Sequence, residues 1–115
     1  MELKEFYNKL NGDYEGVMSR LLTEERVLKY LKKLPASQDF DNLKAGLDAQ
    51  DWELAFRSSH NLKGMCLNLG LDGLFEPSST ICENLRSGSP QEECGPMMEA
   101  VKEKWEETIA AISEL

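Results

Sequence analysis

Apolar residues recur at intervals of three and four along most of the chain, which is the spacing of one face of an α-helix. No stretch shows the strict apolar–polar alternation of a β-strand. The pattern predicts four longer helices, over residues 38–49, 51–69, 72–87 and 90–114, after shorter helices that lie within residues 2–34. Short connections favour antiparallel neighbours. We therefore predict an all-α fold, an antiparallel four-helix bundle with additional short N-terminal helices.

Local signals mark several of the predicted helix ends. Thr23 and Asp51 are residue types that cap helix N-termini. Gly70 is placed to end the helix that follows Asp51, because glycine readily adopts the left-handed conformation of a helix C-terminus. Either Ser37 or Asp39 is expected to open the helix that precedes Asp51.

Prolines leave two of the boundaries open. The run Ser89-Pro90-Gln91-Glu92 has the form of a capping box with proline at the first helical position, and it predicts that the last helix begins at residue 90. Gly95-Pro96 offers a second possible start, at Pro96. Pro77 either lies in the first turn of a helix that begins late, near Glu76, or kinks a helix that began earlier.

The length of 115 residues, with 41% hydrophobic and 30% charged residues, predicts one soluble globular domain. A net charge of −8 argues against nucleic acid or an anionic membrane as the main partner. No segment has the apolar length of a signal peptide or a membrane span. The three cysteines form no C-x-x-C pair, which favours reduced thiols in a cytoplasmic protein. Met1 and the lack of a linker at either end favour a free-standing chain, and we expect a monomer.

The only histidine, His60, lies in the predicted helix 51–69. His60, Lys63, Gly64 and Leu67 stand at i, i+3, i+4 and i+7, so they share one helix face. The bulk of the apolar area lies on a rotated face that carries Phe56, Ser59, Leu62, Cys66 and Leu69. The imidazole should therefore point toward solvent or a shallow groove, with Arg57 one turn before it and Lys63 one turn after it.

These residue types suit phosphoryl transfer. A neutral imidazole nitrogen is a nucleophile that forms covalent intermediates. Lys63, helped by Arg57, would meet the negative charge of a phosphoryl group. Gly64 costs about 1 kcal/mol against alanine inside a helix, and the missing side chain would let a partner protein approach closely. Each residue also has an ordinary explanation: a solvated histidine, a surface lysine and a close helix crossing at the glycine.

The run His60-Asn61-Leu62-Lys63-Gly64, followed by Asn68-Leu69-Gly70-Leu71, resembles the signature of histidine-containing phosphotransfer (HPt) domains, H-x-L-K-G with a downstream L-G. The helical frame from about residue 37 to 115 is similar to the bundle of that family. The resemblance implies that His60 is phosphorylated on its outward nitrogen and exchanges the group with an aspartate. It also implies that Lys63 stabilises the phosphoryl oxygens and that Gly64 leaves room for the partner.

The partners that the resemblance implies are receiver domains of a hybrid histidine kinase and of a response regulator. Mg²⁺ belongs to the receiver domain in that family, so the chain should need no cofactor or metal of its own. We expect Leu67 to supply apolar contact, with Arg57, Asn61 and Asn68 around it. Arg86, at the end of the neighbouring helix, either reaches the phosphoryl group or only interacts with its own helix terminus.

Other functions fit the residues less well. No residue at a fixed spacing from His60 would act as its base, since Phe56 and Arg57 occupy the preceding turn. The chain has no glycine-rich phosphate loop, which excludes a kinase. One imidazole without a cysteine partner gives too few ligands for a transition metal. The chain is therefore predicted to be a phosphoryl carrier rather than an enzyme, and the alternative is an acidic helical interaction module that binds a signalling partner without phosphotransfer.

Overall fold

The computed structural model describes residues 1–115 as seven α-helices and one short 3₁₀ turn. The helices are α1 (Leu3–Lys9), α2 (Tyr14–Leu21), α3 (Glu24–Leu31), α4 (Asp39–Asp48), α5 (Trp52–Leu69), α6 (Asp72–Leu85) and α7 (Gly95–Ile112), with the 3₁₀ turn at Leu34–Ala36. The all-α prediction is confirmed.

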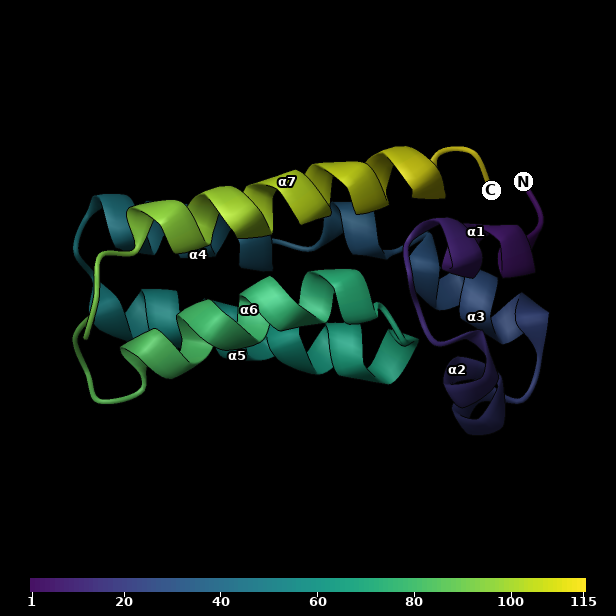
Figure 1. The fold of residues 1–115 in the computed structure, drawn as a ribbon, viewed down its shortest axis with the longest axis horizontal. Helices are drawn as coiled ribbons and strands as arrows, with labels where there is room; N and C mark the ends of the chain where they lie inside the picture. Colours follow the sequence, from purple (N-terminus) through teal and green to yellow (C-terminus); the bar gives the residue numbers. More distant parts are fainter.

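Helices α4 to α7 lie side by side, and each runs antiparallel to the one before it (Figure 1). Helices α1 to α3 are gathered at one end of this group, where both chain termini also lie. The amino group of Met1 donates a hydrogen bond to the carbonyl of Glu114, at 2.8 Å. The N-terminal helices therefore cover one end of the four longer helices, the end at which both α5 and α7 terminate.

The predicted apolar stripes meet in one core of 20 buried residues, to which every α-helix contributes. Phe6, Val17, Val27 and Leu31 are fully buried although they belong to the short N-terminal helices. Their burial is what makes these helices stable, because a helix of seven or eight residues is marginal in water without tertiary packing.

Several helix ends have the predicted caps. The Thr23 side chain accepts a hydrogen bond from the Arg26 amide at 3.2 Å, and the Asp51 side chain accepts one from the Leu54 amide at 3.2 Å. Gly70 ends α5 in the left-handed conformation with φ +67°. Of the two residues expected to open α4, Ser37 precedes the helix and its hydroxyl accepts from the amide of Asp39, the first helical residue.

The predicted start of the last helix at residue 90 is wrong, because α7 begins at Gly95 with Pro96 in its first turn. The capping box predicted at Ser89 needs the amide of Glu92, but the buried side chain of Asn84 takes that amide at 2.8 Å. Asn84 also accepts from the Gln91 amide at 3.1 Å. A side chain from α6 thus holds the segment before α7 in a non-helical form.

Helix α6 begins at Asp72, so the late start near Glu76 is also wrong. Pro77 lies inside the helix, where it has no N–H to donate to the carbonyl of Gly73 four residues earlier. The helix nevertheless continues to Leu85, and Leu74, Ile81 and Leu85 on its inward face are all buried.

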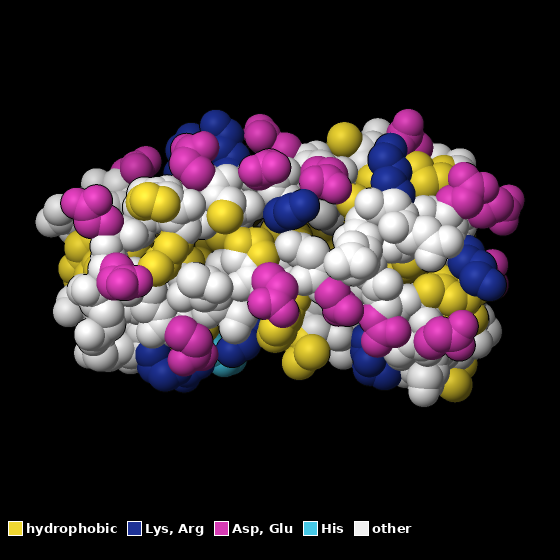
Figure 2. Space-filling model, viewed as in Figure 1, with side chains coloured by type: hydrophobic (Ala, Val, Ile, Leu, Met, Phe, Trp, Pro, Cys, Tyr) yellow, Lys and Arg dark blue, Asp and Glu magenta, His cyan; other side chains and the backbone are white.

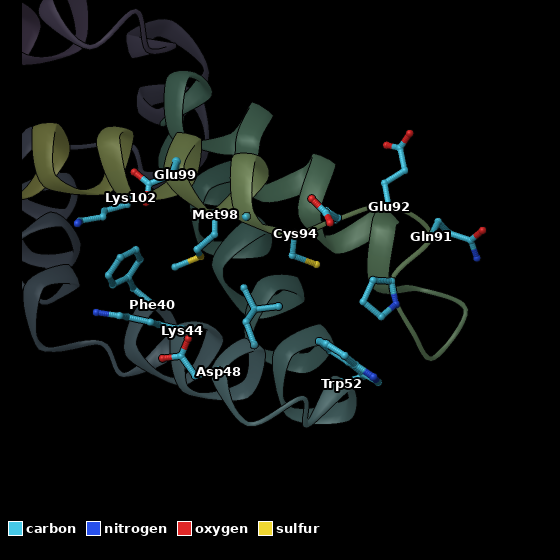
Figure 3. A pocket seen from close by; sticks show the side chains of 14 residues that line it. Phe40, Lys44, Asp48, Trp52, Gln91, Glu92, Cys94, Met98, Glu99 and Lys102 are labelled. Carbon is cyan, nitrogen blue, oxygen red and sulfur yellow. The ribbon is translucent and has the colours of Figure 1, made fainter.

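No helix combines the length and the apolar character needed to cross a lipid bilayer. The structure holds an open groove between α4, the start of α5, the segment before α7 and α7 itself (Figure 3). Phe40, Trp52 and Met98 line it together with the charged side chains Lys44, Asp48 and Lys102. None of its lining residues is among the residues predicted to form the site around His60.

Candidate phosphotransfer site

His60 lies on the exposed side of α5, as its helical position predicts. The core side of the helix carries Ser59, Leu62 and Cys66, each fully buried. In Figure 2 the His60 side chain (cyan) appears at the lower edge, among dark blue basic side chains, with apolar side chains further along that edge toward the N-terminal helices. An electrophile can therefore reach the imidazole from solvent.

The His60 ring lies beside Phe56, one helical turn earlier, with ring centroids 6.1 Å apart and a tilt of 42° between the planes. None of the five ion pairs of the protein includes His60. No carboxylate is thus placed to orient the ring or to act as its base. The site can offer a nucleophilic nitrogen, but the chain does not supply a general base beside it.

Lys63, three residues after His60, is held toward α6. Its ammonium donates to a carboxylate oxygen of Glu83 at 3.3 Å, and the lysine side chain is only 25% exposed. The lysine therefore has a defined position beside the face of α5 that carries His60, Gly64 and Leu67, which we call the His60 face. Glu83 of the neighbouring helix holds it there.

Arg86 is joined to the same carboxylate. It donates to both oxygens of Glu83, at 2.9 and 2.8 Å, and its guanidinium lies 5.4 Å from the centroid of the Phe56 ring. The hydrogen bonds from Arg86, followed by that from Lys63, lower the pKa of Glu83 to about 2. The carboxylate therefore stays ionised at neutral pH and links the two cations on either side of it.

Gly64 faces open space. A β-carbon built on it would have no atom within 4 Å, which removes the close helix crossing as its explanation. By contrast, a β-carbon at Gly46 would lie 2.8 Å from the amide nitrogen of Ala55. Gly46 is needed for α4 to approach α5, whereas no contact within the chain requires a glycine at position 64.

The remaining predicted contact residues surround His60 at different distances. Arg57 and Glu53 form an exposed pair at 4.0 Å one turn earlier on α5. The Asn61 amide donates to Asp39 at the start of α4, at 3.3 Å, which turns this side chain away from Lys63. Leu67 is 61% exposed, and Asn68 is exposed beside it.

Two residues near His60 have roles that the sequence prediction missed. Glu83 bridges Lys63 and Arg86, and Phe56 lies between His60 and Arg86 as their shared apolar neighbour. The spacing of Glu83 and Arg86 at i, i+3 indicates a pair within one helix. Nothing in the sequence indicates that the same carboxylate also reaches Lys63 on another helix.

A comparison with protein families gives one match: the family model described as the Hpt domain covers residues 35–114. The chain belongs to the Hpt family. No curated protein and no solved structure matches the chain significantly. The matched segment contains all of α4 to α7 and every residue of the candidate site, while α1 to α3 lie outside it.

Hpt membership has general consequences for function. Hpt domains take part in phosphotransfer in two-component signalling, as phosphocarriers rather than classical enzymes. They interact with receiver domains of kinases and response regulators.

Proposed function

We propose that this Hpt protein accepts a phosphoryl group on His60 from the aspartyl phosphate of one receiver domain and passes it to an aspartate of another. We further propose that helices α4 to α7 form a four-helix bundle that holds His60 in place, and that the protein acts in the cytoplasm. The observation that carries it is the combination on one face of an exposed imidazole, an anchored lysine and a glycine with open space above it.

In the accepting step, the lone pair of an imidazole nitrogen forms an N–P bond while the P–O bond to the partner's aspartate breaks. The aspartate leaves as a carboxylate, and the proton of the resulting imidazolium passes to solvent. The reverse exchange with a second receiver domain regenerates His60. Each carboxylate would belong to one of the two receiver domains, which would also supply the Mg²⁺ that helps to neutralise its charge.

After phosphorylation, the Lys63 ammonium would turn toward the negatively charged phosphoryl oxygens on His60. In the unphosphorylated protein its ammonium is held by Glu83, and a phosphoryl group on His60 offers a second, more highly charged acceptor. Arg86 already donates to both oxygens of Glu83, so that carboxylate keeps a partner when Lys63 turns toward the phosphate. Arg86 thus supports the site through Glu83, and Arg57 adds positive charge nearby.

Contact with the receiver domain would centre on the His60 face, at Leu67 and Gly64. Leu67 is a large apolar side chain exposed on this face, and its burial against a partner would stabilise the complex. Asn61 and Asn68 lie at the edge of this face. The cations Arg57 and Lys63 give it a local positive charge that suits the acidic phosphate-accepting pocket of a receiver domain.

The test is transfer from a receiver domain phosphorylated with a labelled donor. The wild-type chain should become labelled with a phosphate that acid removes and base does not, as expected for phosphohistidine. His60→Gln should take no label, whereas Glu103→Gln, a change to the same residue type on the exposed surface of α7, should still be labelled. Label that survives His60→Gln would refute the assignment. Partner binding retained by wild type and His60→Ala, with no label on either, would instead support the interaction module.

A further inference from the structure

Helices α1 to α3, outside the family match, are fastened to the end of α5 that follows the phosphotransfer residues. The Arg20 side chain donates to the carbonyls of Leu67 and Asn68, at 3.0 and 3.1 Å. The Asp13 amide donates to the carbonyl of Gly70 at 2.8 Å. These bonds place α2 within one helical turn of the exposed Leu67 on the His60 face.

A groove runs between α2, α3 and α5 at this junction. Met65 and Asn68 of α5 form one side of it, and Leu21, Tyr30 and Lys33 come from the N-terminal segment. Tyr30 is 46% exposed, and the Lys33 ammonium lies 5.6 Å from the centroid of its ring. Asn68, the residue after the exposed Leu67, therefore lies where the predicted receiver contact meets the groove of the N-terminal helices.

The charge of the N-terminal segment differs from that of the rest of the protein. Residues 1–34 hold seven of the 13 lysines and arginines and six of the 21 acids, so their net charge is +1. The remaining residues carry the other six bases and 15 acids, a net charge of −9. Lys29, Lys32 and Lys33 follow one another closely on and after α3. An acidic partner is therefore repelled less by this segment than by the rest of the chain.

We propose that Leu21, Tyr30 and Lys33 form a second half of the receiver-docking surface, which we call the α2–α3 face. The inference rests on the proposed function, since its occupant is the acidic receiver domain that exchanges phosphate with His60. The α2–α3 face adjoins the His60 face at Asn68, and the positive charge of Lys33 complements the acidic receiver domain. The N-terminal helices thereby govern affinity for the receiver domain and the choice among receiver domains, while His60 and Lys63 perform the transfer.

The experiment separates docking from chemistry by the choice of phosphate donor. Phosphoramidate, a small donor that needs no docking surface, is used first to phosphorylate the wild-type chain and the variants Tyr30→Ala and Lys33→Glu. Transfer from each phosphorylated chain is then measured against the concentration of receiver domains from the organism that carries the chain. Lys102→Glu, which makes the same charge change on α7, is the matched control.

We expect phosphoramidate labelling to be equal in all four proteins. Tyr30→Ala and Lys33→Glu should each raise the receiver concentration needed for half-maximal transfer by about tenfold, the usual effect of losing an important interface residue. The maximal rate and the Lys102→Glu control should be unchanged.

Three results would overturn the inference in distinguishable ways. Unchanged receiver dependence in both variants, with normal transfer, would remove the α2–α3 face from the interface and leave the proposed function intact. A wild-type dimer in sedimentation that Tyr30→Ala dissociates would make this face a contact between copies of the chain. Failure of phosphoramidate to label His60, or of every receiver domain to accept the phosphate, would refute the proposed function itself.

Discussion

At the scale of single residues, Gly64 and Gly46 show how differently two helical glycines can be used. A side chain at Gly46 would collide with the backbone of α5, at 2.8 Å from the Ala55 nitrogen, whereas one at Gly64 would project into empty space. Glycine inside a helix costs about 1 kcal/mol against alanine. At Gly46 that cost is offset by close packing of two helices, but at Gly64 the folded chain gains nothing in return.

Gly64→Ala should therefore stabilise the protein and impair its transfer. The expected gain is about 1 kcal/mol of unfolding free energy, measured by denaturant titration. Transfer from a receiver domain should slow because the added methyl group lies beside His60, while labelling by phosphoramidate should persist. Gly46→Ala is the contrasting change and should cost about 1–3 kcal/mol through overpacking. A Gly64→Ala protein that is stabilised and transfers at the normal rate would show that the open space has no role.

At the scale of elements, α5 and α6 are joined beside the site by the bridge from Lys63 to Glu83. Glu83 accepts from Lys63 and, through both oxygens, from Arg86, and these hydrogen bonds hold its pKa at about 2. A carboxyl group whose pKa is lower in the folded state than its usual 4.5 stabilises the fold at pH values above 4.5. That contribution is lost as the pH falls from 4.5 toward 2.

The prediction concerns the difference in Tm between wild type and Glu83→Gln, measured from pH 7 to pH 2.5. Wild type should be the more stable protein near neutrality, and the difference should shrink as the pH falls below 4.5. One molar salt should reduce it as well, because the bridge is exposed and screened by ions. Glu53→Gln is the control, since Glu53 meets Arg57 only at 4.0 Å with both side chains exposed. A difference in Tm that does not depend on pH would mean that the charge of Glu83 is not what stabilises the pair.

At the scale of the whole molecule, buried contacts of high sequence separation join the N-terminal helices to the Hpt segment. The hydroxyl of Tyr7, a fully buried residue, donates to the carbonyl of Leu69 at 2.6 Å. Burial raises the pKa of Tyr7 well above its usual value of 10, so the hydroxyl remains protonated and able to donate. Phe6, beside it, is also fully buried. The N-terminal helices are therefore part of the core, although they lie outside the family match.

Tyr7→Phe should lower the unfolding free energy by about 1–3 kcal/mol, because the buried Leu69 carbonyl loses a hydrogen-bond partner while the ring is kept. Denaturant titration measures this loss. Tyr14→Phe is the control, as its hydroxyl donates to Glu24 in an exposed pair and should contribute much less. Equal losses of unfolding free energy in the two variants would mean that the hydrogen bond between Tyr7 and Leu69 does not stabilise the fold as predicted.

The sequence alone determined the features that depend on neighbouring residues. Apolar spacing predicted the helices and the buried faces, including Leu62 and Cys66, because a helix face repeats locally along the chain. Side-chain caps at Thr23 and Asp51 and the left-handed end at Gly70 were predictable for the same reason. The position of His60 on the exposed face of α5 also follows from periodicity.

The tertiary structure decided what depends on residues far apart in the chain. The last helix begins at Gly95 and not at residue 90, because Asn84 of α6 takes the Glu92 amide that a capping box at Ser89 would use. The pairing of Lys63 with Glu83 and the open space at Gly64 likewise depend on where other helices pack. Local patterns predict how each helix forms, because they depend on residues close together in the chain. Only packing brings a side chain of one helix to the backbone or the charge of another. The site around His60 depends on such contacts between helices.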